Sequence, residues 1–244
     1  MNLNSMLPWR KVKSVPHCSA VILGAGNALR MGTDKMLYEL EGKPVLARTL
    51  LAFESSELVD EIVVVTRPDL LETVAELCKS YKISKISRVI SGGATRTESA
   101  LAGVSEVSPK AKLIAIHDGA RPFVSADLIL RTVFAADEYM AAAPVIPSTD
   151  TLKAIDDKGF MLGTVDREHT VRVQTPQIFK ADLIKAALSR AVEKNLTLTD
   201  DCSAMEMLNV KAHTVQGDED NIKLTTPRDL IAAQAILRDR EELQ

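Results

Sequence analysis

The stretch 19-SAVILGAGNALRMGTDK-35 joins a short apolar run to a glycine-bearing turn. Residues 19–23 predict a buried strand, and Gly24, Ala25 and Gly26 follow it directly. A glycine-rich turn between a strand and a helix brings backbone N–H groups close to a bound phosphate. Arg30 and Lys35 add a bidentate donor and a compact positive charge, which both suit a triphosphate. The stretch therefore predicts an α/β domain with a phosphate site at the end of its first strand.

Two common phosphate motifs do not fit this turn. A dinucleotide fingerprint, G-x-G-x-x-G, would need glycine where Leu29 stands, and no Gly-Lys-Ser/Thr of a Walker A loop follows. A plain strand-to-helix turn with two solvated cations stays open as the alternative for this segment alone.

Strands and helices alternate beyond the loop. The pattern predicts buried strands at residues 61–66, 87–90, 112–116 and 141–145, and helices at 44–53, 68–80, 95–107 and 125–139. Further elements are expected as helices at 181–194, 199–208 and 227–238 and a strand at 210–215. This order predicts a Rossmann-like α/β fold with a mostly parallel twisted sheet.

The alternation is interrupted between residues 150 and 165. Two short strands flank the turn Asp157-Lys158-Gly159, so we expect a β-hairpin that projects as an arm. Residues 1–16 lack an apolar signal core and are interpreted as an N-terminal extension. Residues 17–244 are then expected to form one domain, which the arm leaves at about 150–165.

Composition restricts the partners and the compartment. A net charge of -3 gives no reason to expect nucleic-acid or membrane binding, and no apolar run is long enough to cross a bilayer. The three cysteines, Cys18, Cys78 and Cys202, are widely spaced and form no C-x-x-C pair. A disulfide framework or zinc site is therefore not expected, and we predict a cytoplasmic protein.

Several stretches, in order along residues 18–237, together resemble one known family. They are the loop at 24–35, GGATRTES at 92–99, HDGARP at 117–122, DT at 150–151, TVDR at 164–167, QTPQ at 174–177 and DNIK at 220–223. In this combination the chain resembles the 2-C-methyl-D-erythritol 4-phosphate cytidylyltransferases of the non-mevalonate isoprenoid pathway. The resemblance implies transfer of CMP from CTP to 2-C-methyl-D-erythritol 4-phosphate, with release of pyrophosphate.

The resemblance also implies a CTP site with Mg²⁺ as the cofactor. It assigns CTP binding to Gly24, Ala25, Gly26, Arg30, Lys35, Gly92, Gly93, Ser99 and Asp118. Asp118 would be the metal ligand, and its place after an apolar strand suits the ligand crevice of an α/β sheet. Taken alone, Gly92-Gly93 could be an ordinary strand-end turn and Asp118 a capping residue. We interpret His117 as structural.

The second substrate would be held by a different set of residues. By resemblance they are Arg121, Thr151, Arg167, Thr175, Thr199 and Lys223. The catalytic residues implied are Arg30, Lys35, Arg167 and Lys223. The family also implies a homodimer in which the arm crosses to the partner subunit. Taken singly, Arg167 could be a surface ion-pair residue and Thr175 a turn residue.

Three rival functions remain open at this point. Ribitol-5-phosphate cytidylyltransferases resemble the same motifs and differ in the acceptor. An NAD(P)-dependent oxidoreductase would share the first strand-turn-helix unit, although the missing third glycine and the cation pair count against it. A non-catalytic nucleotide-binding protein would not need so many charged motif residues.

Overall fold

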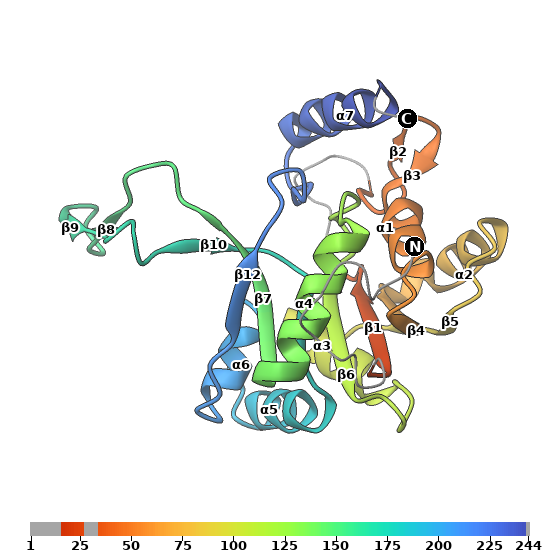
Figure 1. The fold of residues 1–244 in the computed structure, drawn as a ribbon, viewed down its shortest axis with the longest axis horizontal. Coiled ribbons are helices and arrows are strands. Elements are labelled where there is room, and N and C mark those ends of the chain that lie inside the picture. The colour runs from red at the N-terminus through yellow and green to blue at the C-terminus, as the bar shows by residue number, and fades with distance from the viewer. Residues whose placement is uncertain (1–15, 27–33, 243–244) are drawn as a thin grey trace, which may run out of the picture.

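A computed structural model describes residues 16–26 and 34–242 of the chain. Its centre is an eight-stranded sheet in the order β10-β7-β11-β6-β1-β4-β5, with β12 also paired to β7 (Figure 1). The strands of this sheet are β1 (Cys18–Leu23), β4 (Val59–Thr66), β5 (Ile86–Ser91), β6 (Leu113–Asp118), β7 (Ala141–Pro147), β10 (Val171–Val173), β11 (Gln177–Lys180) and β12 (His213–Gln216). A separate two-stranded sheet pairs β2 (Glu39–Leu40) with β3 (Lys43–Pro44).

Helices cover both faces of the sheet. In β1, Ala20 and Ile22 pack into one core cluster, which includes residues of α1, α2 and α4, whereas Val21 and Leu23 pack into a second cluster with α3, α5 and α6. The helices are α1 (Val45–Glu54), α2 (Leu71–Ser80, preceded by the 3-10 turn η2, Pro68–Leu70), α3 (Arg96–Ser105), α4 (Ala126–Tyr139), α5 (Ala181–Glu193), α6 (Cys202–Glu206) and α7 (Pro227–Glu242). Because both faces are buried, β1 is buried along its whole length and is apolar apart from Ser19, rather than alternating. The predicted α/β fold is confirmed.

Four strands were not predicted: the two-residue strands β2 and β3, and the strands β10 and β11 of the central sheet. β11 runs antiparallel between β6 and β7, in the middle of an otherwise mostly parallel sheet, and β10 pairs antiparallel with β7. β11 has only four residues, with Gln177 and Lys180 at its ends, and continues directly into α5. Such a short polar-ended segment carries no period-2 signal. The strand predicted at 210–215 is present as β12, but it begins three residues later, at His213.

The predicted arm is confirmed as a hairpin. β8 (Lys153–Ile155) pairs antiparallel with β9 (Met161–Thr164), and Gly159 takes a positive φ of 87° in the turn between them. Figure 1 shows the hairpin projecting from the sheet at the left, well clear of the helices. Its apolar side chains are exposed, including Ile155 (64%), Phe160 (68%) and Met161 (74%).

All three cysteines are free thiols. None of the helices in residues 16–26 and 34–242 combines the length and the hydropathy needed to cross a bilayer.

Candidate active site

A cavity opens at the carboxyl ends of the parallel strands β1, β5 and β6, where open α/β sheets place their ligands. It joins residues that lie far apart in the sequence. Seven of the predicted site residues line it, namely Ala25, Gly26, Lys35, Gly93, Ser99, Asp118 and Lys223. Its other lining residues are Leu23, Met36, Ala94, Thr95, Arg96 and Ala120.

The glycine loop is tied to the neighbouring strand β4. The backbone N–H of Gly24 donates to the carbonyl of Val65 at 2.7 Å, and a Cβ on Gly24 would lie only 3.3 Å from that oxygen. Residues 27–33, including Arg30, lie outside the described residues. On their far side, Asp34 pairs with Arg67 at 2.8 Å and accepts the N–H of Met36 at 2.9 Å. Lys35 therefore reaches the cavity from an anchored backbone.

The second glycine pair is explained by close packing. A Cβ on Gly92 would lie 2.7 Å from the Ala25 Cβ and from the Ser99 Oγ, and one on Gly93 would lie 2.4 Å from the Glu98 Cβ. The Ser99 hydroxyl accepts the Gly93 N–H at 3.2 Å and donates to the Thr95 carbonyl at 2.8 Å. Ser99 thus links the glycine turn to the first turn of α3, where both border the cavity.

Asp118 carries the carboxylate of the cavity. Its oxygens lie 2.9 Å from Lys223 Nζ, 3.5 Å from Arg121 Nε and 3.8 Å from Arg96 Nη2. Burial alone would raise the pKa of Asp118, but these cations, Lys223 first, outweigh burial and lower it below its ordinary value. The group is therefore an anion at neutral pH, and a hard oxygen ligand.

Lys223 is presented by a rigid loop. On one side, buried Asn221 accepts from Arg121 Nη1 at 2.6 Å through its carbonyl and donates to the Thr175 carbonyl at 2.8 Å through its side chain. On the other side, the Leu224 N–H donates to the Ala120 carbonyl at 2.9 Å. Arg121, predicted to bind substrate, thus holds the Lys223 loop and Asp118 in this structure.

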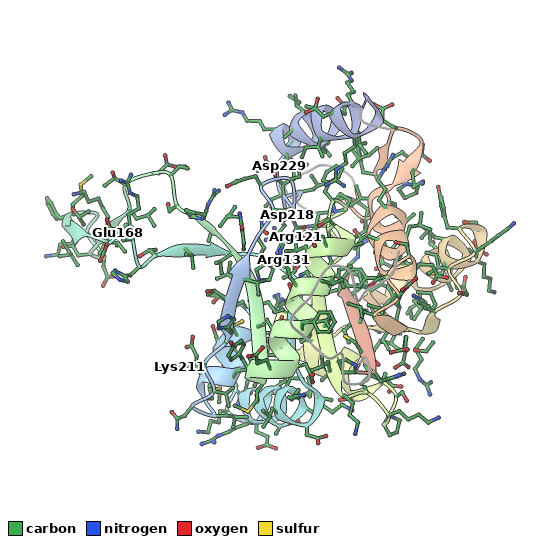
Figure 2. The ribbon with its side chains drawn as sticks, viewed as in Figure 1. Arg121, Arg131, Glu168, Lys211, Asp218 and Asp229 are labelled. Atoms are coloured by element: carbon green, nitrogen blue, oxygen red, sulfur yellow. The ribbon has the colours of Figure 1, made fainter. Side chains whose placement is uncertain are left out.

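The start of the same loop is clamped to α4. Asp218 accepts from Ser125 Oγ at 2.6 Å and forms an ion pair with Arg131. Gln174 Nε2 donates to the carbonyl of Asp218 at 2.8 Å. Figure 2 shows Arg121, Arg131 and Asp218 gathered at one end of α4. These bonds fix the loop that leads to Lys223.

His117 and Thr175 lie beneath the cavity. The Thr175 hydroxyl is 3.0 Å from His117 Nδ1 and accepts the Asp118 N–H at 3.1 Å, while His117 Nε2 lies 3.2 Å from the Arg121 carbonyl. Burial lowers the pKa of His117 from 6.5 to about 4, so the ring is neutral at pH 7. A neutral, fully buried imidazole supports the interpretation of His117 as structural.

The depressed pKa of His117 predicts a specific acid sensitivity. Because the unfolded chain binds a proton at pH 6.5 and the folded one at about 4, His117 stabilises the fold fully above pH 6.5. That contribution, about 3 kcal/mol, is lost as the pH falls from 6.5 to 4. Urea unfolding without divalent cations should therefore show a steeper loss over this window in the wild type than in His117→Asn. Parallel pH curves for the two proteins would contradict the assignment.

Of the six predicted substrate residues, only Lys223 lines this cavity, Arg121 and Thr175 contact Asp118, and the other three do neither. Thr151 and Arg167 are exposed on the arm, and Thr199 is exposed in the segment before α6. Figure 2 shows Glu168, which follows Arg167 in the sequence, on the projecting part of the chain and away from Arg121 in the body.

Sequence reasoning assigned no role to Arg96 and Asp201. Arg96 lines the cavity, and its guanidinium binds both carboxylate oxygens of Asp201, at 2.9 and 2.7 Å. Arg96 lies inside the GGATRTES motif and Asp201 ends the TDD stretch at 199–201, so the sequence contained a local signal for each residue but none for their contact. Their pairing spans 105 positions, and no local pattern indicates it.

Comparisons of the sequence with known proteins point to one family. The sequence pattern of the family described as 2-C-methyl-D-erythritol 4-phosphate cytidylyltransferase matches residues 18–239. A protein of that name from Caldanaerobacter subterraneus subsp. tengcongensis is 40% identical over 223 residues, which cover 90% of this chain and 98% of that protein. Another from Halalkalibacterium halodurans is 41% identical, with 89% and 95% covered.

Solved structures give the same result. The 4-diphosphocytidyl-2C-methyl-D-erythritol synthase of Anaerococcus prevotii superposes with a TM-score of 0.82 at 34% identity, covering 91% of this chain and 96% of that one. The 2-C-methyl-D-erythritol 4-phosphate cytidylyltransferase of Thermus thermophilus gives 0.75 at 32% identity, with 91% and 99% covered. From sequence pattern, relatives and fold together, this chain belongs to the 2-C-methyl-D-erythritol 4-phosphate cytidylyltransferase family.

Proposed function

We propose that the chain transfers CMP from CTP to 2-C-methyl-D-erythritol 4-phosphate, forming 4-diphosphocytidyl-2-C-methyl-D-erythritol and pyrophosphate for isoprenoid synthesis. The observation that carries this function is the cavity in which Lys35, Lys223 and Asp118 meet the glycine turn at residues 92–93. Family membership supports the same reaction. Family membership argues against the two rival functions of an NAD(P)-dependent oxidoreductase and a non-catalytic nucleotide-binding protein.

The reaction needs positioned charge rather than a general base. A phosphomonoester is mostly a dianion at neutral pH, so its oxygen can attack the α-phosphorus of CTP without losing a proton first. The barrier comes from repulsion between anions and from charge on the transferring group. Lys35 is proposed to stabilise this charge from the cavity wall, together with Arg30 from the neighbouring loop. Lys223 is proposed to orient the attacking phosphate.

We propose Mg²⁺ as the cofactor, with Asp118 as its protein ligand. The residues fit such an ion, since Asp118 is a charged oxygen ligand facing the cavity. The described residues hold no group of three or more His, Cys, Asp or Glu that could bind a metal, so the nucleotide phosphates would supply the other ligands. When bound, the ion would neutralise phosphate charge and favour the departure of pyrophosphate.

The acceptor pocket is proposed to form between two subunits. Lys223 lines the cavity directly, and Arg121 and Thr175 support it from below. Thr151 and Arg167 would come from the arm of a partner, and Thr199 from the rim of the body. The exposed apolar side chains of the arm support this exchange, because an isolated hairpin with exposed Phe160 and Met161 gains by covering them.

Removing Arg167 should weaken the acceptor selectively. We expect Arg167→Ala to raise the KM for 2-C-methyl-D-erythritol 4-phosphate about 10-fold or more, because a charge-assisted contact to its phosphate is lost. The affinity for CTP should change little. Initial rates with each substrate varied in turn test this, with Glu168→Ala on the same turn as control. An equal loss of CTP affinity would remove Arg167 from the acceptor pocket.

A mixing experiment tests which subunit supplies Arg167. If the arm crosses, a hybrid dimer of Lys35→Ala and Arg167→Ala chains contains one site with both changes and one intact site. At an acceptor concentration well below its KM, the mixture should regain about a quarter of the wild-type rate after subunit exchange, since half of the dimers are hybrids and each hybrid has one intact site. Activity that stays at the mean of the two variants would show that both residues come from one chain.

Product analysis tests the reaction itself. The purified chain is incubated with CTP, Mg²⁺ and either 2-C-methyl-D-erythritol 4-phosphate or ribitol 5-phosphate, and CDP-linked product and pyrophosphate are measured. We expect product with the first acceptor. Product with ribitol 5-phosphate alone would favour the ribitol-5-phosphate cytidylyltransferase, and no product with either acceptor would refute the proposal. A cytoplasmic location remains a prediction supported by the three free thiols.

A further inference from the structure

Asp201 is a carboxylate buried beside the cavity. Its side chain is only 1% exposed, and burying an isolated carboxylate is strongly unfavourable. Arg96 compensates with two parallel N–H···O bonds, at 2.9 and 2.7 Å. A buried ion pair adds little stability over apolar side chains of similar size. Because apolar side chains at these two positions would stabilise the fold as well, the ion pair indicates that a guanidinium in a fixed position has a function here.

Both partners of the pair are held from their backbones. Arg96 is the first residue of α3, whose start is fixed by a capping box between Thr95 and Glu98. Asp201 is the N-cap residue that precedes α6, and the Gln177 side chain accepts its backbone N–H at 2.9 Å. Gln177 also donates to Asp200 at 3.0 Å. The positions of the guanidinium and the carboxylate are therefore set before any ligand arrives.

The guanidinium retains hydrogen-bonding capacity toward the cavity. Arg96 lines the cavity and its side chain is 27% exposed. Arginine has five N–H donors in a planar fork, and the bonds to Asp201 use two of them. Nη2 lies 3.8 Å from Asp118, so the group stands beside the carboxylate that is proposed to bind the metal. Lysine in this position could not bind Asp201 in a bidentate manner.

We propose that Arg96 is a further nucleotide-binding residue and that Asp201 is the positioning residue that holds its guanidinium toward CTP. This inference rests on the proposed function, because it takes CTP as the ligand of the cavity. Asp201 acts through Arg96 and does not touch the nucleotide. The negative charge of Asp201 also neutralises the charge of Arg96, which weakens the electrostatic attraction between Arg96 and Asp118.

A double-mutant cycle measures the coupling. CTP is titrated calorimetrically into the full chain with Mg²⁺. We expect Arg96→Ala to raise the Kd about 10-fold and Asp201→Asn about 5-fold. The double variant should bind CTP no more weakly than Arg96→Ala alone, because the carboxylate has nothing left to position. Asp137→Asn, which breaks the exposed 2.6 Å pair with Lys180, is the matched control and should leave the Kd unchanged.

A conservative variant separates positioning from folding. Arg96→Lys keeps the charge beside Asp201 but loses the fork, so CTP should bind more weakly while the thermal melting temperature stays near that of the wild type. Wild-type affinity in Arg96→Ala would overturn the inference, as would a further loss when Asp201→Asn is added to it. If the wild type itself binds no CTP, the proposed function fails instead.

Discussion

Replacing Lys35 by alanine is expected to lower kcat about 100-fold or more, the scale of loss when a preorganised charge donor is removed. Lys35 lines the cavity next to the glycine loop, and its backbone is anchored by the Asp34–Arg67 pair at 2.8 Å. Its charge would oppose the negative charge that builds up on the α-phosphate. Pyrophosphate release at saturating CTP, Mg²⁺ and acceptor measures this effect directly.

The control for Lys35→Ala removes a lysine elsewhere. Lys211 is exposed near α6, at the lower edge of the molecule in Figure 2, and Lys211→Ala should leave kcat unchanged. The loss in Lys35→Ala should lie mainly in kcat, since the interaction strengthens as the transition state forms. A variant that turns over within a factor of about 3 of the wild type would remove Lys35 from the mechanism.

Asp118→Asn is expected to lower kcat/KM about 1000-fold, because it removes both the proposed metal ligand and the counter-charge of three cations. Lys223 lies 2.9 Å from this carboxylate, and Arg121 and Arg96 lie within 3.8 Å. The amide is a weaker ligand for Mg²⁺ and cannot pair with these groups. Initial rates over a Mg²⁺ titration should therefore show a higher half-saturating concentration in the variant.

Two comparisons keep the Asp118 prediction specific. Asp182→Asn changes an exposed carboxylate in the first turn of α5 and should leave both the rate and the Mg²⁺ dependence intact. Direct binding of Mn²⁺ in the presence of CTP, followed by electron paramagnetic resonance, provides a readout besides activity. An unchanged Mg²⁺ dependence in Asp118→Asn would show that this carboxylate is not the ligand.

The fold could be predicted where elements are long and strongly patterned. The apolar runs of β1, β4 and β6 indicated buried strands, and the Ser125 cap marked the start of α4. β11 could not be predicted, because its four residues gain their strand geometry from pairing with β6 on one side and β7 on the other. That pairing depends on the tertiary structure, so local strand propensity does not predict it.

The sequence predicted the residue types of the site better than the orientation of their side chains. Lys35, Asp118, Lys223 and residues of both glycine turns line one cavity, and their roles in binding stay predictions. Sequence gave no means to see that the Thr175 hydroxyl faces His117 and Asp118, or that Arg121 supports the Lys223 loop. Side-chain direction depends on which strand lies beside which, so a motif names candidates without fixing their orientation.

The arm is continuous with the floor of the cavity. Its returning strand, β10, ends at Val173, and a single residue, Gln174, separates it from Thr175, whose hydroxyl accepts the Asp118 N–H at 3.1 Å. Val171 is also paired with Pro147, the last residue of the outgoing strand β7. Only a few hydrogen-bonded residues therefore connect the hairpin with the backbone of Asp118. A contact that displaces the hairpin would be transmitted through them to this carboxylate.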